Sequence, residues 1–396
     1  MKVKPADRTA SVQEYYFSRK LSQIEMMRRS GTDVINLGIG SPDQPPSENT
    51  IRRLSEEAAR PGVHGYQSYN GNAILRKAFV DWYLKYFRVS LNPDNEILPL
   101  MGSKEGIMHI SLAFVNEGDE VLVPDPGYPT YSSVTSLVGG KIKYYPLEER
   151  NGWHPDLELL EKEDLGKVKL MWVNYPNMPT GARGSLELFR KLVSFAARHN
   201  ILLCNDNPYS FILSNEYLSL LSTEGAMETA LELNSLSKSH NMAGWRLGMV
   251  AGNPEYIKNI LKVKSNMDSG MFLPMQLAAA EALNNPPSWY DEINSIYRQR
   301  RIIAESLMDL LQCRFDKSQS GLFLWGRLPD TIGSCEAYVE EILGRAHVFI
   351  TPGFIFGPGG DRYIRISLCA TEERLIEARS RINEVLNQSS ITNHHT

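Results

Sequence analysis

The chain has few of the features that mark secreted or metal-binding proteins. Its 396 residues include only four cysteines, and these are widely spaced: Cys204, Cys313, Cys335 and Cys369. Such spacing fits neither a paired metal site nor a disulfide framework. We therefore expect reduced cysteines in the core, no metal centre and a cytoplasmic location.

Long apolar runs and runs of one charge are also missing. No stretch of about 18 apolar residues predicts a membrane span, and the opening MKVKPADRTASVQEYY has no apolar segment of a signal peptide. The formal net charge of −4 is spread along the chain. We expect neither a nucleic-acid nor a membrane partner, and a small anionic ligand would need local positive charge.

From residue 97 onward the sequence alternates short apolar segments with amphipathic ones, which predicts strands and helices in turn. The segment VKLMWVN at 168–174 is almost continuously apolar, as in a sheet covered on both faces. The strands are expected at 97–101, 120–124, 141–145, 168–174, 201–204 and 230–233. The pattern predicts an α/β fold with a mostly parallel central sheet sandwiched by helices.

The pattern changes after about Pro274, where a long helix to Leu311, three strands and a closing helix after Thr371 are expected. This predicts a smaller α+β domain. The pattern at 12–29 predicts an amphipathic helix, which would pack either on its own core or on a neighbouring subunit. We divide the chain into an N-terminal arm with part of the small domain (1–46), a large domain (47–275) and a small C-terminal domain (276–396).

Polar residues follow the ends of several predicted strands. Ser103 and Lys104 open a helix whose free amides suit an anion, although a lysine there is often only solvated. Tyr128 and Asp206 follow two other strands, and Asp206 is either a turn residue or a buried functional carboxylate. Because the carboxyl ends of parallel strands meet at one edge of a sheet, these residues predict a single crevice.

The segment SLSKSHNMAGWRLG at 235–248 follows the last of these strands. A lone Ser-Lys-Ser would indicate a surface charge. Here Ser235, Ser237 and Arg246 accompany Lys238, and two hydroxyls with a guanidinium suit a phosphate. An amine beside a phosphate site is what a pyridoxal 5′-phosphate enzyme needs, because the amine forms a Schiff base with the cofactor aldehyde.

With these motifs the chain resembles the class I/II aminotransferase family of fold-type-I pyridoxal-phosphate enzymes, from about Asn36 to Glu373. Its most specific part is Ser-x-Ser-Lys-(x)5-Gly-x-Arg-x-Gly at 235–248, and it looks most like the branch of LL-diaminopimelate and aspartate aminotransferases. The resemblance implies a fold-type-I enzyme whose large domain binds the cofactor. It would move an amino group from an L-amino acid (aspartate, LL-diaminopimelate or similar) to a 2-oxo acid.

Two other functions are open at this point. One is a carbon–sulfur lyase of the same fold. The other is a regulatory or binding protein that keeps a pyridoxal site, but no helix-turn-helix extension precedes residue 30 and the reactive residues are complete.

The resemblance also implies a role for each site residue. Lys238 would be the Schiff-base lysine and proton shuttle, Asp206 would pair with the pyridine nitrogen, Tyr209 with the phenolic oxygen, and Tyr128 would stack on the ring. The phosphate would be held by Ser103, Lys104, Ser235, Ser237 and Arg246. Tyr66 would reach the cofactor of a neighbouring subunit, which implies a homodimer with sites at the interface. Arg365 would bind the substrate carboxylate, and Gly40 would supply a backbone contact.

One position departs from the family pattern. The residue before Pro-Thr-Gly is usually an asparagine that contacts both cofactor and substrate, and here it is Met178. A methionine cannot donate that hydrogen bond. Asn177 or Asn174 would have to take its place through a shifted loop, and we assign Asn177 to the cofactor site.

Overall fold

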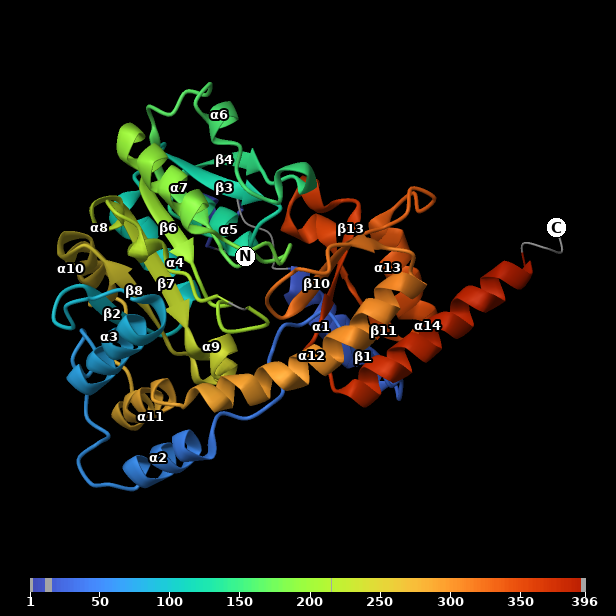
Figure 1. Cartoon of the computed structure of the whole chain (residues 1–396), viewed down its shortest axis with the longest axis horizontal. Helices are drawn as coiled ribbons and strands as arrows, with labels where there is room; N and C mark the ends of the chain where they lie inside the picture. Colours follow the sequence, from blue (N-terminus) through green and yellow to red (C-terminus); the bar gives the residue numbers. More distant parts are fainter. Residues whose placement is uncertain (1–2, 11–15, 215, 393–396) are drawn as a thin grey trace.

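A seven-stranded sheet forms the centre of the larger part of the molecule in the computed structural model, which describes residues 3–10, 16–214 and 216–392 (Figure 1). Its strands in spatial order are β2 (Ile97–Leu100), β8 (Gly248–Gly252), β7 (Ala230–Ser235), β6 (Leu202–Asp206), β5 (Val168–Val173), β3 (Glu120–Asp125) and β4 (Lys141–Pro146). Strand β8 is antiparallel to both neighbours, and the other neighbouring pairs are parallel. The expected α/β fold with a mostly parallel sheet is confirmed.

Helices cover both faces of this sheet because successive side chains of a strand point to opposite sides. On β5, Met171 and Val173 join one apolar cluster, whereas Leu170 and Trp172 join another. The first cluster includes residues of α3 (Ala73–Phe87), α7 (Leu186–His199) and α11 (Leu273–Leu283), and the second includes residues of α4 (Ser103–Phe114), α5 (Pro129–Leu137) and α10 (Pro254–Lys264). Helix α2 (Glu48–Ala58) packs on α11, and α6 (Leu157–Leu160) and α8 (Ala226–Thr229) are short.

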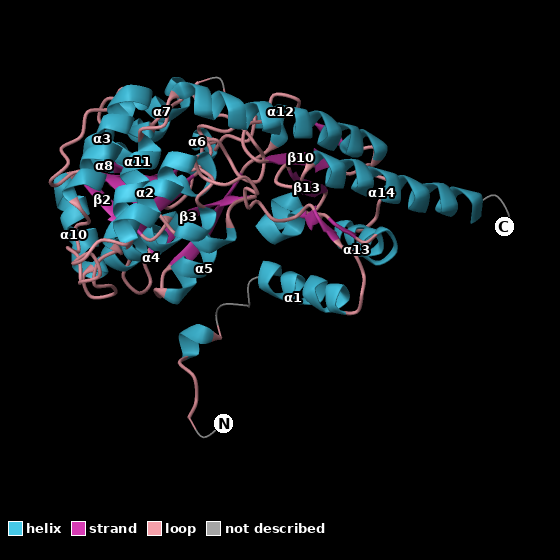
Figure 2. Ribbon diagram, turned by 90° about the horizontal axis from the view of Figure 1, so that it is seen from below, coloured by secondary structure: helices cyan, strands magenta, loops and turns pink. Residues whose placement is uncertain are grey.

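The smaller part of the molecule has its own apolar cluster around a four-stranded antiparallel sheet. This sheet has the order β12 (Thr351–Pro352), β13 (Tyr363–Ser367), β10 (Phe323–Arg327), β9 (Arg314–Phe315). Around it lie α1 (Tyr16–Arg29), α13 (Cys335–Ala346) and α14 (Glu372–Thr392), and the long α12 (Pro287–Leu310) connects the two parts (Figures 1 and 2). None of the helices in the described ranges is long and apolar enough to cross a bilayer.

The N-terminal segment crosses from the small part to the large part beside the sheet edge. Within this segment Ile35–Asn36 forms a short strand, β1, which pairs in parallel with β11 (Val348–Phe349). Beyond it the backbone lies against side chains so closely that a Cβ on Gly40 would stand 2.1 Å from Phe323. The expected helix at 12–29 is described from Tyr16, and residues 11–15 lie outside the described ranges.

Several elements were not predicted from the sequence, among them β8 and α11. Strand β8 is rich in glycine, which is unusual for a strand. Helix α11 is mostly buried and lacks the polar face by which an amphipathic helix is recognised. Tyr290 belongs to the cluster of the large part, and Ile293, three residues later on α12, belongs to that of the small part. The division at residue 276 stays a prediction, and these clusters favour a boundary inside α12.

A buried ion pair fixes the N-terminal segment to α12, and its loss should destabilise the protein. Arg300, with 3% of its side chain exposed, donates to both carboxylate oxygens of Asp43 at 2.7 Å. Asp43→Ala leaves that guanidinium without its counter-charge, so we expect the free energy of unfolding to fall by about 2–4 kcal/mol. Urea denaturation measures this change.

Asp33→Ala is the matched control. Asp33 also binds two arginines, Arg374 and Arg381, but 59% of its side chain is exposed. Exposed pairs contribute little, so this variant should lose much less stability. Equal losses in the two variants would contradict the role assigned to burial.

Candidate active site

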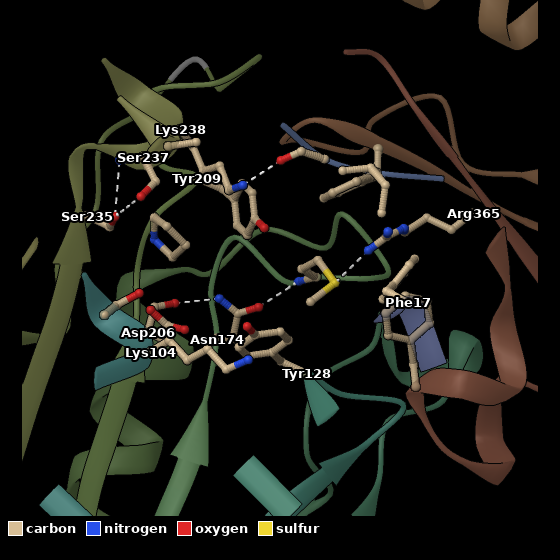
Figure 3. A pocket seen from close by; sticks show the side chains of 18 of the residues that line it. Phe17, Lys104, Tyr128, Asn174, Asp206, Tyr209, Ser235, Ser237, Lys238 and Arg365 are labelled. Carbon is tan, nitrogen blue, oxygen red and sulfur yellow. Dashed lines mark hydrogen bonds between the residues drawn. The ribbon is translucent and has the colours of Figure 1, made fainter. Parts of the chain in front are cut away.

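A cavity of about 610 Å³ lies where the carboxyl ends of the central strands face the small part (Figure 3). Eleven of the predicted site residues line it: Gly40, Ser103, Lys104, Tyr128, Asp206, Tyr209, Ser235, Ser237, Lys238, Arg246 and Arg365. They come from separate segments that the sheet brings to one edge, as expected for an α/β fold. The cavity is large enough for a cofactor together with a small substrate.

Lys238 stands on α9 (Leu236–Ser239), directly after β7. Ser235 caps this short helix, because its Oγ accepts the amide of Ser237 at 3.1 Å. The Lys238 amine donates to the carbonyl oxygen of Gly40 at 2.5 Å. Burial lowers the pKa of this amine, and the positive charges of Arg365 and Arg246 lower it further. The amine is thus more readily neutral and nucleophilic than an exposed lysine.

Asp206 ends β6 and is 4% exposed. Its Oδ2 accepts the hydroxyl of Tyr131 at 3.0 Å, while its Oδ1 has no hydrogen-bond partner among the described residues. Burial raises the pKa of this carboxyl group to about 7, against the lowering by the hydroxyls of Tyr131 and Ser103. An unpaired buried carboxylate oxygen is costly, so this position suits a ligand with a protonated ring nitrogen.

The helix start at Ser103 forms an anion cradle with the Lys238 segment. Gly102 has a φ of 90°, and a Cβ there would lie 2.4 Å from Nη2 of Arg246, so a glycine is required. The hydroxyls of Ser235 and Ser237 lie 2.8 Å apart on the facing segment. Burial lowers the pKa of Lys104, and the charge of Arg246 adds to this effect. Amides at a helix start, hydroxyls and a guanidinium suit a phosphate group.

Arg365 enters the cavity from β13 of the small part and is 4% exposed. Its Nη2 donates to the carbonyl oxygen of Gly38 at 2.7 Å, and its Nη1 lies 3.1 Å from the sulfur of Met178. The guanidinium carbon lies 3.8 Å from the ring centre of Phe323. A planar cation held in this way can bind a carboxylate through two parallel hydrogen bonds.

The geometry does not support the assignment of Asn177. Its side chain is buried outside the cavity, where its Oδ1 accepts the amide and the hydroxyl of Thr180 at 3.2 and 2.8 Å. Asn174 does line the cavity, but it donates to the carbonyl of Asp206 and accepts the amide of Met178 at 2.7 Å. Met178 itself therefore occupies the place beside Arg365.

Tyr66 lies away from the cavity of its own chain, with 92% of its surface exposed. Tyr209, in contrast, is 7% exposed, and burial raises the pKa of its hydroxyl above the usual value. The Tyr209 hydroxyl therefore stays protonated and can donate a hydrogen bond.

Several lining residues were not identified from the sequence. Tyr131 packs flat on Trp172 at 5.1 Å and holds Asp206, and its only sequence signal is its position three residues after Tyr128. Phe17, Leu21, Ile39 and Phe356 also line the cavity. In the sequence they look like ordinary apolar residues of separate elements.

A mostly parallel sheet with a lysine, a carboxylate and an anion cradle at its carboxyl edge defines a pyridoxal-phosphate enzyme. The chain belongs to the class I and II aminotransferases, because the profile of the family Aminotransferase class I and II matches residues 32–382. The expected resemblance is thereby confirmed. The enzyme uses pyridoxal phosphate, and its substrates are amino acids and 2-oxo acids.

Relatives of known name support the family. The chain is 39% identical over 382 residues to LL-diaminopimelate aminotransferase from Aquifex aeolicus, covering 96% of this chain and 98% of the relative. It is 40% identical over 383 residues to the enzyme of that name from Moorella thermoacetica, with 96% and 98% covered. Substrate-bound BacF from Bacillus subtilis superimposes with a TM-score of 0.92 at 33% identity, covering 97% of this chain and 98% of BacF. These matches do not favour the lyase alternative.

The residues present fit the cofactor. Its phosphate matches the cradle of Ser103, Ser235, Ser237 and Arg246, and its ring nitrogen matches the unpaired Oδ1 of Asp206. Pyridoxal phosphate would be held at both ends by chain residues.

The raised pKa of Asp206 predicts a pH-dependent cost in the cofactor-free protein. A folded-state pKa of about 7, against about 3.9 in the unfolded chain, means that the folded state binds the proton more tightly. The contribution of this group to stability is then greatest below about pH 4, falls as the pH rises to about 7, and is constant above. Asp206→Asn removes this pH dependence. The difference in unfolding free energy between the cofactor-free variant and wild type should therefore rise by about 2 kcal/mol or more from pH 5 to pH 8, in favour of the variant. Urea denaturation at both pH values measures this gain, and an unchanged difference would contradict the assignment.

Proposed function

We propose that this aminotransferase works as a cytoplasmic homodimer in which Lys238, Asp206 and Arg365 carry the reaction. The observation that carries the proposal is the unpaired, buried Oδ1 of Asp206 in the same cavity as the Lys238 amine. The described cysteines are unpaired and buried, which suits a reducing compartment.

The lysine and the carboxylate have complementary tasks. Pyridoxal phosphate, when bound, supplies an electron sink that makes the Cα proton of the substrate acidic. The Asp206 carboxylate stabilises a proton on the ring nitrogen, which keeps that sink effective. The Lys238 amine, with its pKa lowered by burial, takes the proton from Cα.

Arg365 orients the substrate. It would bind the α-carboxylate through two donors, and its contact with the carbonyl of Gly38 keeps the guanidinium in place. The carbonyl of Gly40, two residues after Gly38, accepts the hydrogen bond of the Lys238 amine. Substrate Cα would thus be placed beside the amine that takes its proton.

The donor is open in this proposal. The relatives are named for LL-diaminopimelate, so this amino acid and aspartate are the first donors to compare. A half-reaction screen tests the function directly: holoenzyme is mixed with single amino acids, and the cofactor absorbance is followed. If no amino acid changes that absorbance, the proposed function is wrong.

Lys238→Ala should abolish covalent attachment of the cofactor. Borohydride reduction followed by dialysis should leave wild type labelled and this variant unlabelled, because the amine that forms the Schiff base is removed. Lys104→Ala is the control, since it removes another lysine of the same cavity and should stay labelled. Labelling of the Lys238→Ala variant would refute the assignment; mass spectrometry of the intact chain reads it out.

The family resemblance assigns Tyr66 to the cofactor site of the partner subunit, and its high exposure in its own chain fits such a role in trans. Tyr66→Phe should weaken cofactor binding about 10-fold or more, because a hydrogen bond to a charged phosphate is lost. In a mixed dimer of this variant with Lys238→Ala, one of the two sites has both native residues, so that site should bind the cofactor with wild-type affinity. Fluorescence titration with the cofactor measures this.

Recovery on mixing distinguishes the two arrangements. If Tyr66 acted within its own chain, no mixed dimer would contain a complete site and no recovery would occur. Sedimentation of the active protein as a monomer would also contradict the proposal.

A further inference from the structure

Apolar side chains from several segments line the cavity, next to the polar Ser18. Phe17 and Leu21 come from α1, and Ile39 comes from the N-terminal segment. Because Phe17 and Leu21 are four residues apart, they lie on one face of the helix. Leu21 keeps 42% of its surface exposed although it lines the cavity. Its apolar surface is therefore available to a ligand.

Aromatic rings surround the proposed carboxylate anchor. The guanidinium carbon of Arg365 lies 3.8 Å from the ring centre of Phe323, 4.7 Å from that of Phe356 and 5.5 Å from that of Phe17. Figure 3 shows Phe17 beside Arg365. The thioether of Met178 contacts the same guanidinium, where the family pattern has a polar amide. A substrate bound by its α-carboxylate would thus have its side chain close to hydrocarbon.

Every charged side chain that lines the cavity in the described ranges already has a task in the proposed function. Lys238, Asp206 and Arg365 carry the reaction, and Lys104 and Arg246 bind the phosphate. The loop at 64–71, which a partner subunit would contribute with Tyr66, reads HGYQSYNG and has no lysine, arginine or carboxylate. A distal charge on the substrate would be desolvated against apolar groups, which disfavours its binding there.

Building on the proposed function, we propose that these apolar residues, Phe17, Leu21 and Ile39 with the rings around Arg365, contact the substrate side chain and determine which donors are accepted. The preferred donors are then L-amino acids with uncharged apolar or aromatic side chains, such as phenylalanine, leucine or methionine. The corresponding 2-oxo acids are the preferred acceptors. This differs from aspartate and LL-diaminopimelate, the donors that the family resemblance suggests.

The first test compares donors on wild-type holoenzyme. Single-turnover conversion of the bound cofactor is measured with phenylalanine, leucine and methionine, and with aspartate, glutamate and LL-diaminopimelate. We expect the best apolar donor to exceed every charged donor by at least about 10-fold in kcat/KM. If a charged donor is best, the inference is overturned while the proposed function stands. If no donor reacts, the proposed function fails as well.

The second test changes one of these apolar residues. Leu21→Arg places a guanidinium in the lining of the cavity, so the ratio of kcat/KM for glutamate to that for leucine should rise about 10-fold or more. Leu21→Met keeps an apolar side chain of similar volume, so its ratio should stay within about 2-fold of wild type.

The ratio separates contact with the substrate from damage to the fold, because misfolding lowers both rates together. An unchanged ratio in the Leu21→Arg variant, with both donors still converted, would show that α1 does not touch the substrate side chain. That result would overturn the inference.

Discussion

The rest of the site depends on the burial of opposite charges at the edge of the central sheet. Asp206 is so deeply buried that its pKa rises to about 7, and burial also lowers the pKa of the Lys238 amine. Both groups are thus shifted towards their neutral forms. A ligand that pairs with the carboxylate and reacts with the amine would relieve both costs. This relief would contribute to the free energy of cofactor binding.

The fold supplies this arrangement by joining two apolar cores at one cavity. The lysine, the carboxylate and the anion cradle stand on the large part, whereas Arg365 stands on the small part. The segment at 38–40 lies between them, because its carbonyl oxygens accept hydrogen bonds from both Arg365 and Lys238. The position of the substrate carboxylate relative to the reactive amine therefore depends on this short segment.

Much of the fold and the reactive residues could be predicted from the sequence, because they follow local patterns. Apolar runs mark β5 and β6, and the residue just after a strand end is close to the cavity in a parallel sheet, which located Asp206. The segment around Lys238 is specific by its spacing. The rest depends on tertiary contacts. The rings around Arg365 come from separate segments of the chain that only the tertiary fold brings together. No local pattern contains that information.

The most direct test of the account is the protonation of Asp206 with and without pyridoxal phosphate. Selective ¹³C labelling of aspartate carboxyl groups, with Asp206→Asn to assign the signal, gives its pKa by NMR titration. The account predicts a pKa near 7 in the cofactor-free protein and an ionised carboxylate at pH 6 once the cofactor is bound. A carboxylate already ionised at pH 6 without cofactor, and unchanged when it binds, would contradict the central claim.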